Sequence, residues 1–144
     1  MNRRILRLLG TDGKMSYREV AQRLNRSPST VRDRIGRMEE DGIILGYVAL
    51  VNAEQMGMRA EGIVLADIAE GFTVGDLREL KEIEGVTEVL FVSGEKNVMV
   101  RVQAEDNRQL EEVVSGKIAS SGLTDIELIV ALDSVMRFPE VSLE

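Results

Sequence analysis

The sequence predicts an α+β protein made of a helical first part and a second part in which strands and helices alternate. Signals for short amphipathic helices fill residues 1–50, whereas residues 63–132 show a strand–helix–strand pattern twice. The charge also divides, because residues 1–50 hold ten Lys/Arg and six Asp/Glu (net +4) and residues 51–144 hold eight and nineteen (net −11). This asymmetry indicates two modules, a basic one suited to nucleic acid and an acidic one suited to other partners or simply to solubility.

The composition is typical of a folded protein and excludes several kinds of site. Of the 144 residues, 44% are hydrophobic and 30% are charged. Cysteine is absent, which excludes a disulfide or thiolate metal site, and so is histidine, the commonest general base and metal ligand. No apolar run reaches the roughly 20 residues that span a bilayer, and the N-terminus lacks the pattern of a signal peptide. We therefore expect a cytoplasmic protein that is not an enzyme and has no catalytic residue, metal or cofactor.

Two helices are predicted at the start of the chain. The first covers Arg4 to Leu9. The second begins after Ser16, because Ser16 and Glu19 have the spacing of a capping box, in which hydroxyl and carboxylate each accept a hydrogen bond from the other residue's backbone N–H. Its apolar stripe continues to about Asn25.

A third helix follows after a turn of about three residues. Ser27 is a favourable N-cap, and Pro28 fits the first helical position, where its missing N–H costs nothing. Apolar residues at helical spacing define a core face, and Gly42 ends the run. Three helices with a tight turn between the last two predict a helix-turn-helix, of the winged type, whose third helix enters the major groove of double-stranded DNA.

The exposed face of the third helix supplies the candidate DNA-binding residues. We expect Ser29, Thr30 and Arg32 to reach base edges, and Arg34 and Arg37 to hold phosphates, although either arginine could read a guanine instead. Ser27, at the start of the helix, completes the set. The alternative is a solvated helical hairpin that carries arginines without binding DNA.

The second part of the chain predicts a linker strand and then two similar units. The linker strand is expected around Ile44 to Val51. In the first unit a helix opened by Thr73 and Asp76 joins two strands, and in the second a helix opened by Asp106 and Gln109 does so. The four strands are expected at Ile63–Ile68, Val86–Ser93, Val98–Gln103 and Leu123–Leu132. The order β-α-β-β-α-β predicts a ferredoxin-like sandwich, with two helices on one face of a four-stranded antiparallel sheet.

The other face of this sheet is expected to be covered as well. The run Val89, Leu90, Phe91 and Val92 is apolar on both alternations, so neither face of that strand suits water. The same sheet of a second subunit would cover it and would supply the two-fold symmetry with which helix-turn-helix dimers read half-sites. The linker strand or a tail of the same chain is the alternative cover.

Residues 16–52, SYREVAQRLNRSPSTVRDRIGRMEEDGIILGYVALVN, resemble the DNA-binding segment of the Lrp/AsnC family of transcriptional regulators. The Ser-Pro-Ser-Thr-Val start of the third helix, Arg34, the Arg-Met-Glu run and the Gly-Ile-Ile-x-Gly-Tyr turn carry the resemblance. The later elements also follow the family's order. The N-terminus is shorter than is usual in the family and lacks its leading Asp, so the first helix could be cut short or poorly capped.

The resemblance implies a sequence-specific DNA-binding regulator that forms a homodimer, with assembly into tetramers or octamers. It also implies an amino acid or related metabolite as effector, bound near the loop that joins the second and third strands. That loop contains Ser93, Gly94, Glu95 and Asn97. The family often has Gly, Asp, an aromatic residue and Asp there, so Gly94 matches, Glu95 nearly matches, and Lys96 and Asn97 depart.

Two other readings of the same architecture stay open. Siroheme decarboxylases resemble this family in both domains, but their chemistry relies on histidine, which is absent here. A pure assembly protein would no longer bind DNA, against the arginine content of the first part. On the family's pattern we expect a DNA-binding domain at 1–43, a linker strand and hinge at 44–59, and an oligomerisation and effector-sensing domain at 60–144.

Overall fold

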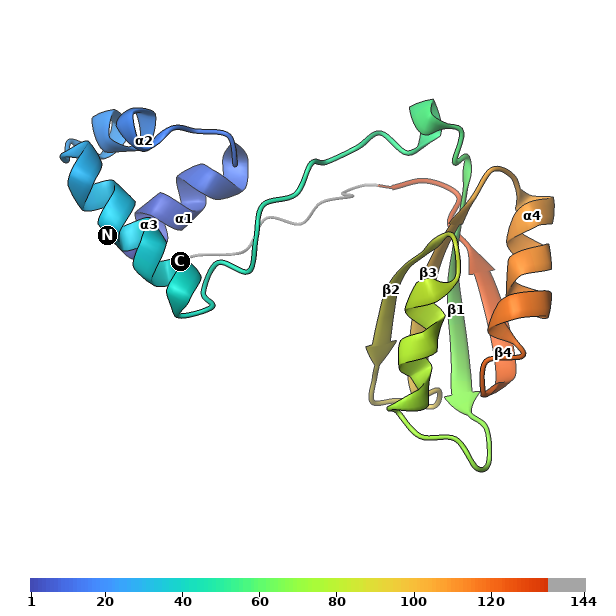
Figure 1. The fold of residues 1–144 in the computed structure, drawn as a ribbon. Helices are drawn as coiled ribbons and strands as arrows, with labels where there is room; N and C mark the ends of the chain where they lie inside the picture. The colour runs from blue at the N-terminus through green and yellow to red at the C-terminus, as the bar shows by residue number, and fades with distance from the viewer. Residues whose placement is uncertain (135–144) are drawn as a thin grey trace. The chain divides into compact units, whose positions relative to one another are not determined.

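A computed structural model describes residues 1–134 of the chain, and residues 135–144 of the predicted third domain lie outside the described part. The described residues form two compact units, one of residues 1–50 and one that begins at residue 51. The first unit consists of helices, and the second of a sheet with helices packed on it (Figure 1). The predicted boundaries at 43 and 59 stay a prediction.

The first unit contains α1 (Asn2–Thr11), α2 (Tyr17–Leu24) and α3 (Pro28–Glu40). One apolar face of each helix packs into a common core, and none of the core side chains is more than 7% exposed. The core consists of Ile5, Val20, Ala21, Leu24, Val31, Ile35 and Met38. The core face of the third helix therefore lies as predicted, which leaves the opposite face to solvent.

The turn between α2 and α3 is fixed by hydrogen bonds at both helix ends. Asn25 adopts the left-handed conformation at φ 52°, and the N–H of Arg26 donates to the carbonyl of Ala21 at 2.9 Å, which terminates α2. The Ser16–Glu19 capping box is present, and Ser27 caps α3 through the N–H of Thr30. The helix-turn-helix is thus confirmed.

The first helix differs from the prediction in length. It runs from Asn2 to Thr11 rather than from Arg4 to Leu9, so it is not cut short. Its N-cap, Met1, makes no side-chain capping bond, as expected from the missing Asp.

The predicted linker strand at Ile44–Val51 does not form in the single chain. Residues 44–51 have no strand pairing, and the first regular element after α3 is a 3-10 turn, η1 (Glu54–Met56). A strand requires a hydrogen-bonded neighbour, which an apolar sequence alone cannot provide. The segment keeps apolar side chains in solvent, with Leu45 94% and Val48 87% exposed.

The second unit contains an antiparallel sheet of β1 (Ala60–Ile68), β2 (Val86–Phe91), β3 (Val98–Ala104) and β4 (Leu123–Val130). The strand order is β2-β3-β1-β4, and every neighbouring pair is antiparallel. This is the order expected of the predicted ferredoxin-like fold, which is confirmed. The strand ends differ from the prediction by up to three residues, the largest shift being the earlier start of β1.

Helices from both halves of this unit pack on the same sheet face. The first is η2 (Asp76–Glu82), and the second is α4 (Asn107–Glu112), which continues as the π-helical turn η3 (Val113–Ile118). Leu80, Leu110 and Ile118 are fully buried against Val64, Val100 and their neighbours. At the centre of this contact Gly62 gives Leu110 room, because a Cβ on Gly62 would lie 3.1 Å from both Leu110 methyl groups.

The first of these helices, η2, differs from the predicted helix. A helix opened by Thr73 and Asp76 was expected to be an α-helix, but η2 is a 3-10 helix that begins at Asp76. The Asp76 carboxylate accepts from both the N–H and the hydroxyl of Thr73, whereas the N–H of Asp76 donates to the Thr73 carbonyl. The Thr73 hydroxyl is therefore used as a donor and does not cap an α-helix.

Candidate DNA-binding interface and effector loop

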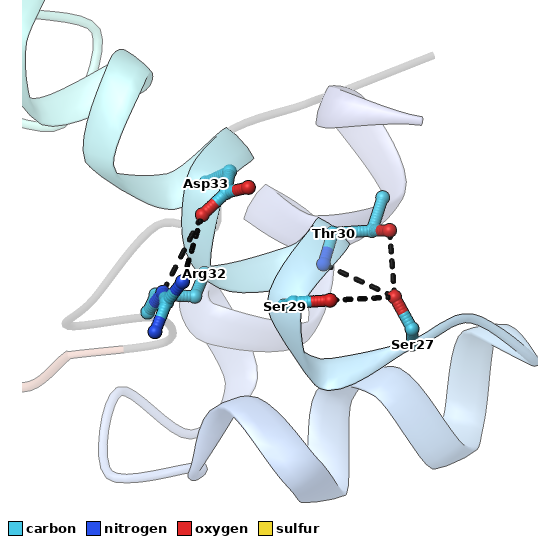
Figure 2. A network of polar contacts seen from close by, with 5 residues as sticks. All are labelled: Ser27, Ser29, Thr30, Arg32 and Asp33. Carbon is cyan, nitrogen blue, oxygen red and sulfur yellow. Dashed lines mark hydrogen bonds and ion pairs between the residues drawn. The ribbon is translucent and has the colours of Figure 1, made fainter.

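The amino end of α3 carries a cluster of three hydroxyls (Figure 2). The Ser27 Oγ accepts from the Thr30 N–H at 3.2 Å and also lies 2.7 Å from the Thr30 Oγ1 and 3.1 Å from the Ser29 Oγ. All three residues are exposed. Because the cap fixes the first turn, Ser29 and Thr30 are held on the outer surface of the helix, at the end that helix-turn-helix proteins place in the major groove.

The three arginines of α3 differ in their partners. Arg32 forms an ion pair with Asp33 at 3.3 Å, with both side chains more than 60% exposed (Figure 2). Arg34 donates to the Oδ1 of Asn2 at 3.1 Å and so connects α3 to the start of α1. Among residues 1–134, the guanidinium of Arg37 has no hydrogen-bond or ion-pair partner. These contacts distinguish Arg34 from Arg37, which the sequence assigned alike to phosphates.

The chain that leaves α3 is anchored to it by Tyr47. The Tyr47 hydroxyl donates to the Oε1 of Glu39 at 2.9 Å. Desolvation of the ring and the neighbouring Glu39 carboxylate raise the pKa of Tyr47 to about 12, so the donor stays protonated at neutral pH. Residues up to Tyr47 therefore belong structurally to the helical unit.

The predicted effector loop has an exposed tip and a structured base. Ser93, Gly94 and Glu95 are exposed, and the Glu95 carboxylate has no partner among the described residues. Asn97 instead lies at the base, where its Oδ1 accepts from the N–H of Ile68 at 3.2 Å. Three of the four candidate residues therefore lie exposed at the tip, whereas Asn97 takes part in the hydrogen bonds of the base.

The sheet face opposite the helices is a mixture of apolar and charged side chains. Ile63, Leu65 and Met99 are half-buried, whereas Leu90 and Ile129 are each 42% exposed. Strand pairing makes them neighbours, since Leu65 and Leu90 both pair with Met99, and Ile63 pairs with Ile129. These five residues form what we call the outer apolar row. The Val89 side chain, by contrast, packs against the core.

An ion-pair network lies beside the outer apolar row. Arg101 on β3 pairs with Glu61 on β1 at 2.8 Å and with Glu88 on β2 at 3.2 Å. The hydrogen bond to Glu61, with a contribution from Glu88, raises the pKa of Arg101 above its ordinary value. The guanidinium on β3 thus forms an ion pair with a carboxylate on each of its two neighbouring strands.

Sequence reasoning missed the partners that orient these side chains. Asn2 and Arg34 are 32 residues apart, and Lys96 is separated by 29 residues from each of its two carboxylate partners, Asp67 and Asp125. No local spacing signals such pairs, which depend on the fold.

Within the described residues there is no cluster of His, Cys, Asp or Glu able to hold a metal ion. The helices of residues 1–134 include none with the length and hydropathy that crossing a bilayer requires.

Two family models match the chain. Residues 1–44 match a winged helix-turn-helix DNA-binding model, and residues 77–141 match the Lrp/AsnC ligand binding domain. The two matches fall on the two units that the structure separates.

Relatives span nearly the same length. The transcriptional regulator LrpA1 of Halobacterium salinarum is 34% identical over 84% of this chain and 86% of its own. LrpA of Pyrococcus horikoshii is 30% identical over 91% of this chain and 94% of its own.

Solved structures share the fold. The structure of AsnC from E. coli has a TM-score of 0.82 at 23% identity and covers 97% of this chain and 96% of its own. A Neisseria meningitidis transcriptional regulator in complex with L-methionine has a TM-score of 0.87 at 19% identity, over 99% and 94% of the two chains. The two family models and the relatives at 30% identity or more, taken with the helix-turn-helix and the ferredoxin-like unit, show that the chain belongs to the Lrp/AsnC family of DNA-binding, ligand-modulated transcriptional regulators.

Proposed function

We propose that this regulator reads a specific operator through the outer face of α3, with Ser29, Thr30 and Arg37 making the primary contacts. The observation that carries this assignment is the pairing pattern on α3. The hydroxyls are held by the Ser27 cap, and Arg37 alone among the three arginines of α3 keeps a guanidinium without a partner in residues 1–134. Such a guanidinium exchanges only water for phosphate or guanine, whereas Arg32 and Arg34 must first give up Asp33 and Asn2.

The operator is proposed to be read by a homodimer built on the outer apolar row. Two copies of this face would remove Leu90 and Ile129 from water and place two α3 helices about a two-fold axis. Half-sites would then lie about 10 bp apart or a multiple of that spacing. Tetramers or octamers would repeat the same unit, and the protein would act in the cytoplasm, where it meets double-stranded DNA.

Footprinting on the DNA upstream of the gene tests the dimeric reading. The wild-type chain should protect paired patches separated by whole helical turns, and Leu90→Glu should lose them because it places a charge in the outer apolar row. Val74→Glu is the matched control, since Val74 is 48% exposed against 42% for Leu90 but lies outside the row. The dimer is contradicted if both variants lose the protected patches equally, or if the wild-type chain protects single patches and not pairs. Absence of any protection favours the assembly protein that does not bind DNA.

The effector is proposed to be an amino acid or related small metabolite that binds near the tip of the loop at Ser93, Gly94 and Glu95. Support comes from the match to the Lrp/AsnC ligand binding domain and from the exposed Glu95 carboxylate, which has no partner in the described part of the chain. Calorimetric titration with a panel of amino acids and their 2-oxo acids tests this assignment. No heat with any of them contradicts it.

We further propose that the chain acts as a regulator and not as an enzyme. The relatives are transcriptional regulators, and the sequence has no histidine to serve the chemistry of the siroheme decarboxylases. Mixing the protein with siroheme should leave the absorbance spectrum of the free pigment unchanged. A saturable spectral shift would support the enzyme.

A further inference from the structure

The base of the 93–97 loop holds an ammonium group of the protein's own. The Nζ of Lys96 lies 3.4 Å from the Oδ2 of Asp67, at the end of β1, and forms a second ion pair with the carboxylate of Asp125, near the start of β4. Two strands thus each present a carboxylate to one cation from the loop between β2 and β3.

The same carboxylate also holds the neighbouring backbone. The Oδ1 of Asp67 accepts from the N–H of Asn97 at 3.2 Å, and the Asn97 side chain accepts from Ile68, as described above. The pairing of β1 with β4 shifts register between Leu65 and Asp67, so Asp67 lies at an irregularity of the sheet. Both oxygens of Asp67 are therefore used by consecutive residues of the loop.

The position is partly withdrawn from solvent. The Lys96 side chain is 17% exposed and that of Asp67 31%, whereas Asp125 is 75% exposed. Without Lys96, the carboxylates of Asp67 and Asp125 would lie near the same position with no cation between them. Two unpaired carboxylates attract a cation from solution.

We propose that Lys96 is a specificity-determining residue that fills this carboxylate pair with a built-in ammonium and so excludes ligands that bind through an ammonium group of their own. The inference rests on the proposed effector role of the loop. The amino group of a free amine or amino acid offers the same charge and three N–H donors as a lysine side chain. Lys96 and such a ligand therefore compete for one position.

The inference narrows the class of effector. Amino acids cannot place their ammonium between Asp67 and Asp125 while Lys96 occupies it. Ligands that bind at the exposed tip of the loop are then recognised through other groups, for example the carboxylate of a 2-oxo acid. Lys96 also ties the base of the loop to β1 and β4 through these two ion pairs.

Chemical complementation of a lysine deletion tests this role. Full-length Lys96→Ala protein, labelled with ¹⁵N-asparagine, is titrated with propylammonium chloride, and the backbone signal of Asn97 is followed by NMR. The chain has five asparagines, so the spectrum stays simple even in a large assembly. We expect a saturable shift of the Asn97 signal towards its wild-type position, and no saturable shift in the wild-type protein. Lys96→Met is measured in parallel, so that the test survives if the alanine variant does not fold.

The controls separate occupancy from general salt effects. Tetramethylammonium has the same charge but no N–H donor and should leave Lys96→Ala unchanged. Lys117→Ala, which removes an exposed lysine on η3, should behave as wild type with both cations. Lys96→Ala with Asp67→Asn should lose the response to propylammonium.

Each result bears on one claim. A Lys96→Ala signal that does not respond to propylammonium, or that responds equally to tetramethylammonium, overturns the inference. So does saturable binding of an amino acid to the wild-type chain that shifts Asn97 and is abolished by Asp67→Asn. Operator binding by the same samples tests the proposed function separately. If the Asn97 signal responds to propylammonium but the protein does not bind the operator, only the proposed function is contradicted.

Discussion

Arg34 on α3 donates to the Oδ1 of Asn2 at the first residue of α1, at 3.1 Å. The contact joins α3, the helix proposed to face DNA, to α1, which completes the core of the helical unit. Because both residues are at the surface, it adds little to stability, but it sets the direction of the Arg34 guanidinium. Asp33 does the same for Arg32, so Arg37 is left as the arginine of α3 best placed to meet DNA without rearrangement.

Replacement of Arg37 is therefore expected to weaken operator binding. Arg37→Ala should reduce affinity and lower the slope of log K against log salt by about 1 if the guanidinium meets a phosphate. If it meets a guanine, discrimination against a changed base pair should fall by about 1–3 kcal/mol instead. Fluorescence anisotropy at several salt concentrations distinguishes the two. Arg78→Ala, which removes an exposed arginine on η2, is the control and should change neither quantity.

Ser27 is expected to have a capping role that can be separated from DNA binding. Ser27→Ala removes the acceptor of the Thr30 N–H and should lower the free energy of unfolding of the helical unit by about 1 kcal/mol. Ser27→Asp should keep that stability, since Asp is an equally good N-cap, yet weaken DNA binding by adding a negative charge near the phosphates.

Tyrosine fluorescence suits the measurement of both Ser27 variants, because the two tyrosines of the chain, Tyr17 and Tyr47, lie in the helical unit. An alanine variant as stable as wild type would contradict the capping role.

Gly85 and Gly71 provide a matched pair for backbone strain in the second unit. Both have positive φ, at 91° and 87°, but a Cβ on Gly85 would lie 2.3 Å from the carbonyl oxygen of Gln103, whereas one on Gly71 meets nothing within 4 Å. Gly71→Ala should cost about 1 kcal/mol from the left-handed backbone alone. Gly85→Ala should cost at least about 2 kcal/mol more, because backbone must move. Urea unfolding followed by circular dichroism should show this order, and equal losses would contradict the close approach of Gly85 to Gln103 as the cause.

The capping box of α2 predicts a pH dependence. Hydrogen bonds from the Ser16 hydroxyl and N–H lower the pKa of Glu19. Since the folded-state pKa lies below the unfolded one, the capping contribution is present above the ordinary Glu range and is lost as pH falls through the depressed value. Carboxyl NMR should give a Glu19 pKa below the usual value in wild type and nearer to it in Ser16→Ala. The Asp76 pKa, lowered by Thr73, should be unchanged by that substitution.

The sequence predicted those parts of the fold that depend on local patterns. The Ser16–Glu19 box, the Ser27 cap and the apolar spacing of α3 each act within one or two turns, so they could be recognised without the fold. The order of strands also followed, because the two strand–helix–strand units allow few topologies.

The errors and omissions have a common cause in contacts that the sequence does not display. The apolar segment at Ile44–Val51 was expected to be a strand but has no partner strand within the described chain, and the Thr73 hydroxyl is a donor where an acceptor was expected. At the candidate sites, the partners of Arg34 and Lys96 are brought close only by the packing of distant elements. Residue type identified the candidates, whereas the fold decided which of them are already engaged.

Binding of the full-length protein to its own upstream DNA, compared with a scrambled duplex of equal length and composition, tests the central claim most directly. The account predicts tighter binding to the upstream duplex and a preference that persists as salt rises. On both duplexes the logarithm of the binding constant should fall linearly with the logarithm of the salt concentration, because counterions are released. Equal binding to the two duplexes at every salt concentration, with or without the candidate effectors, would contradict the claim that α3 reads sequence.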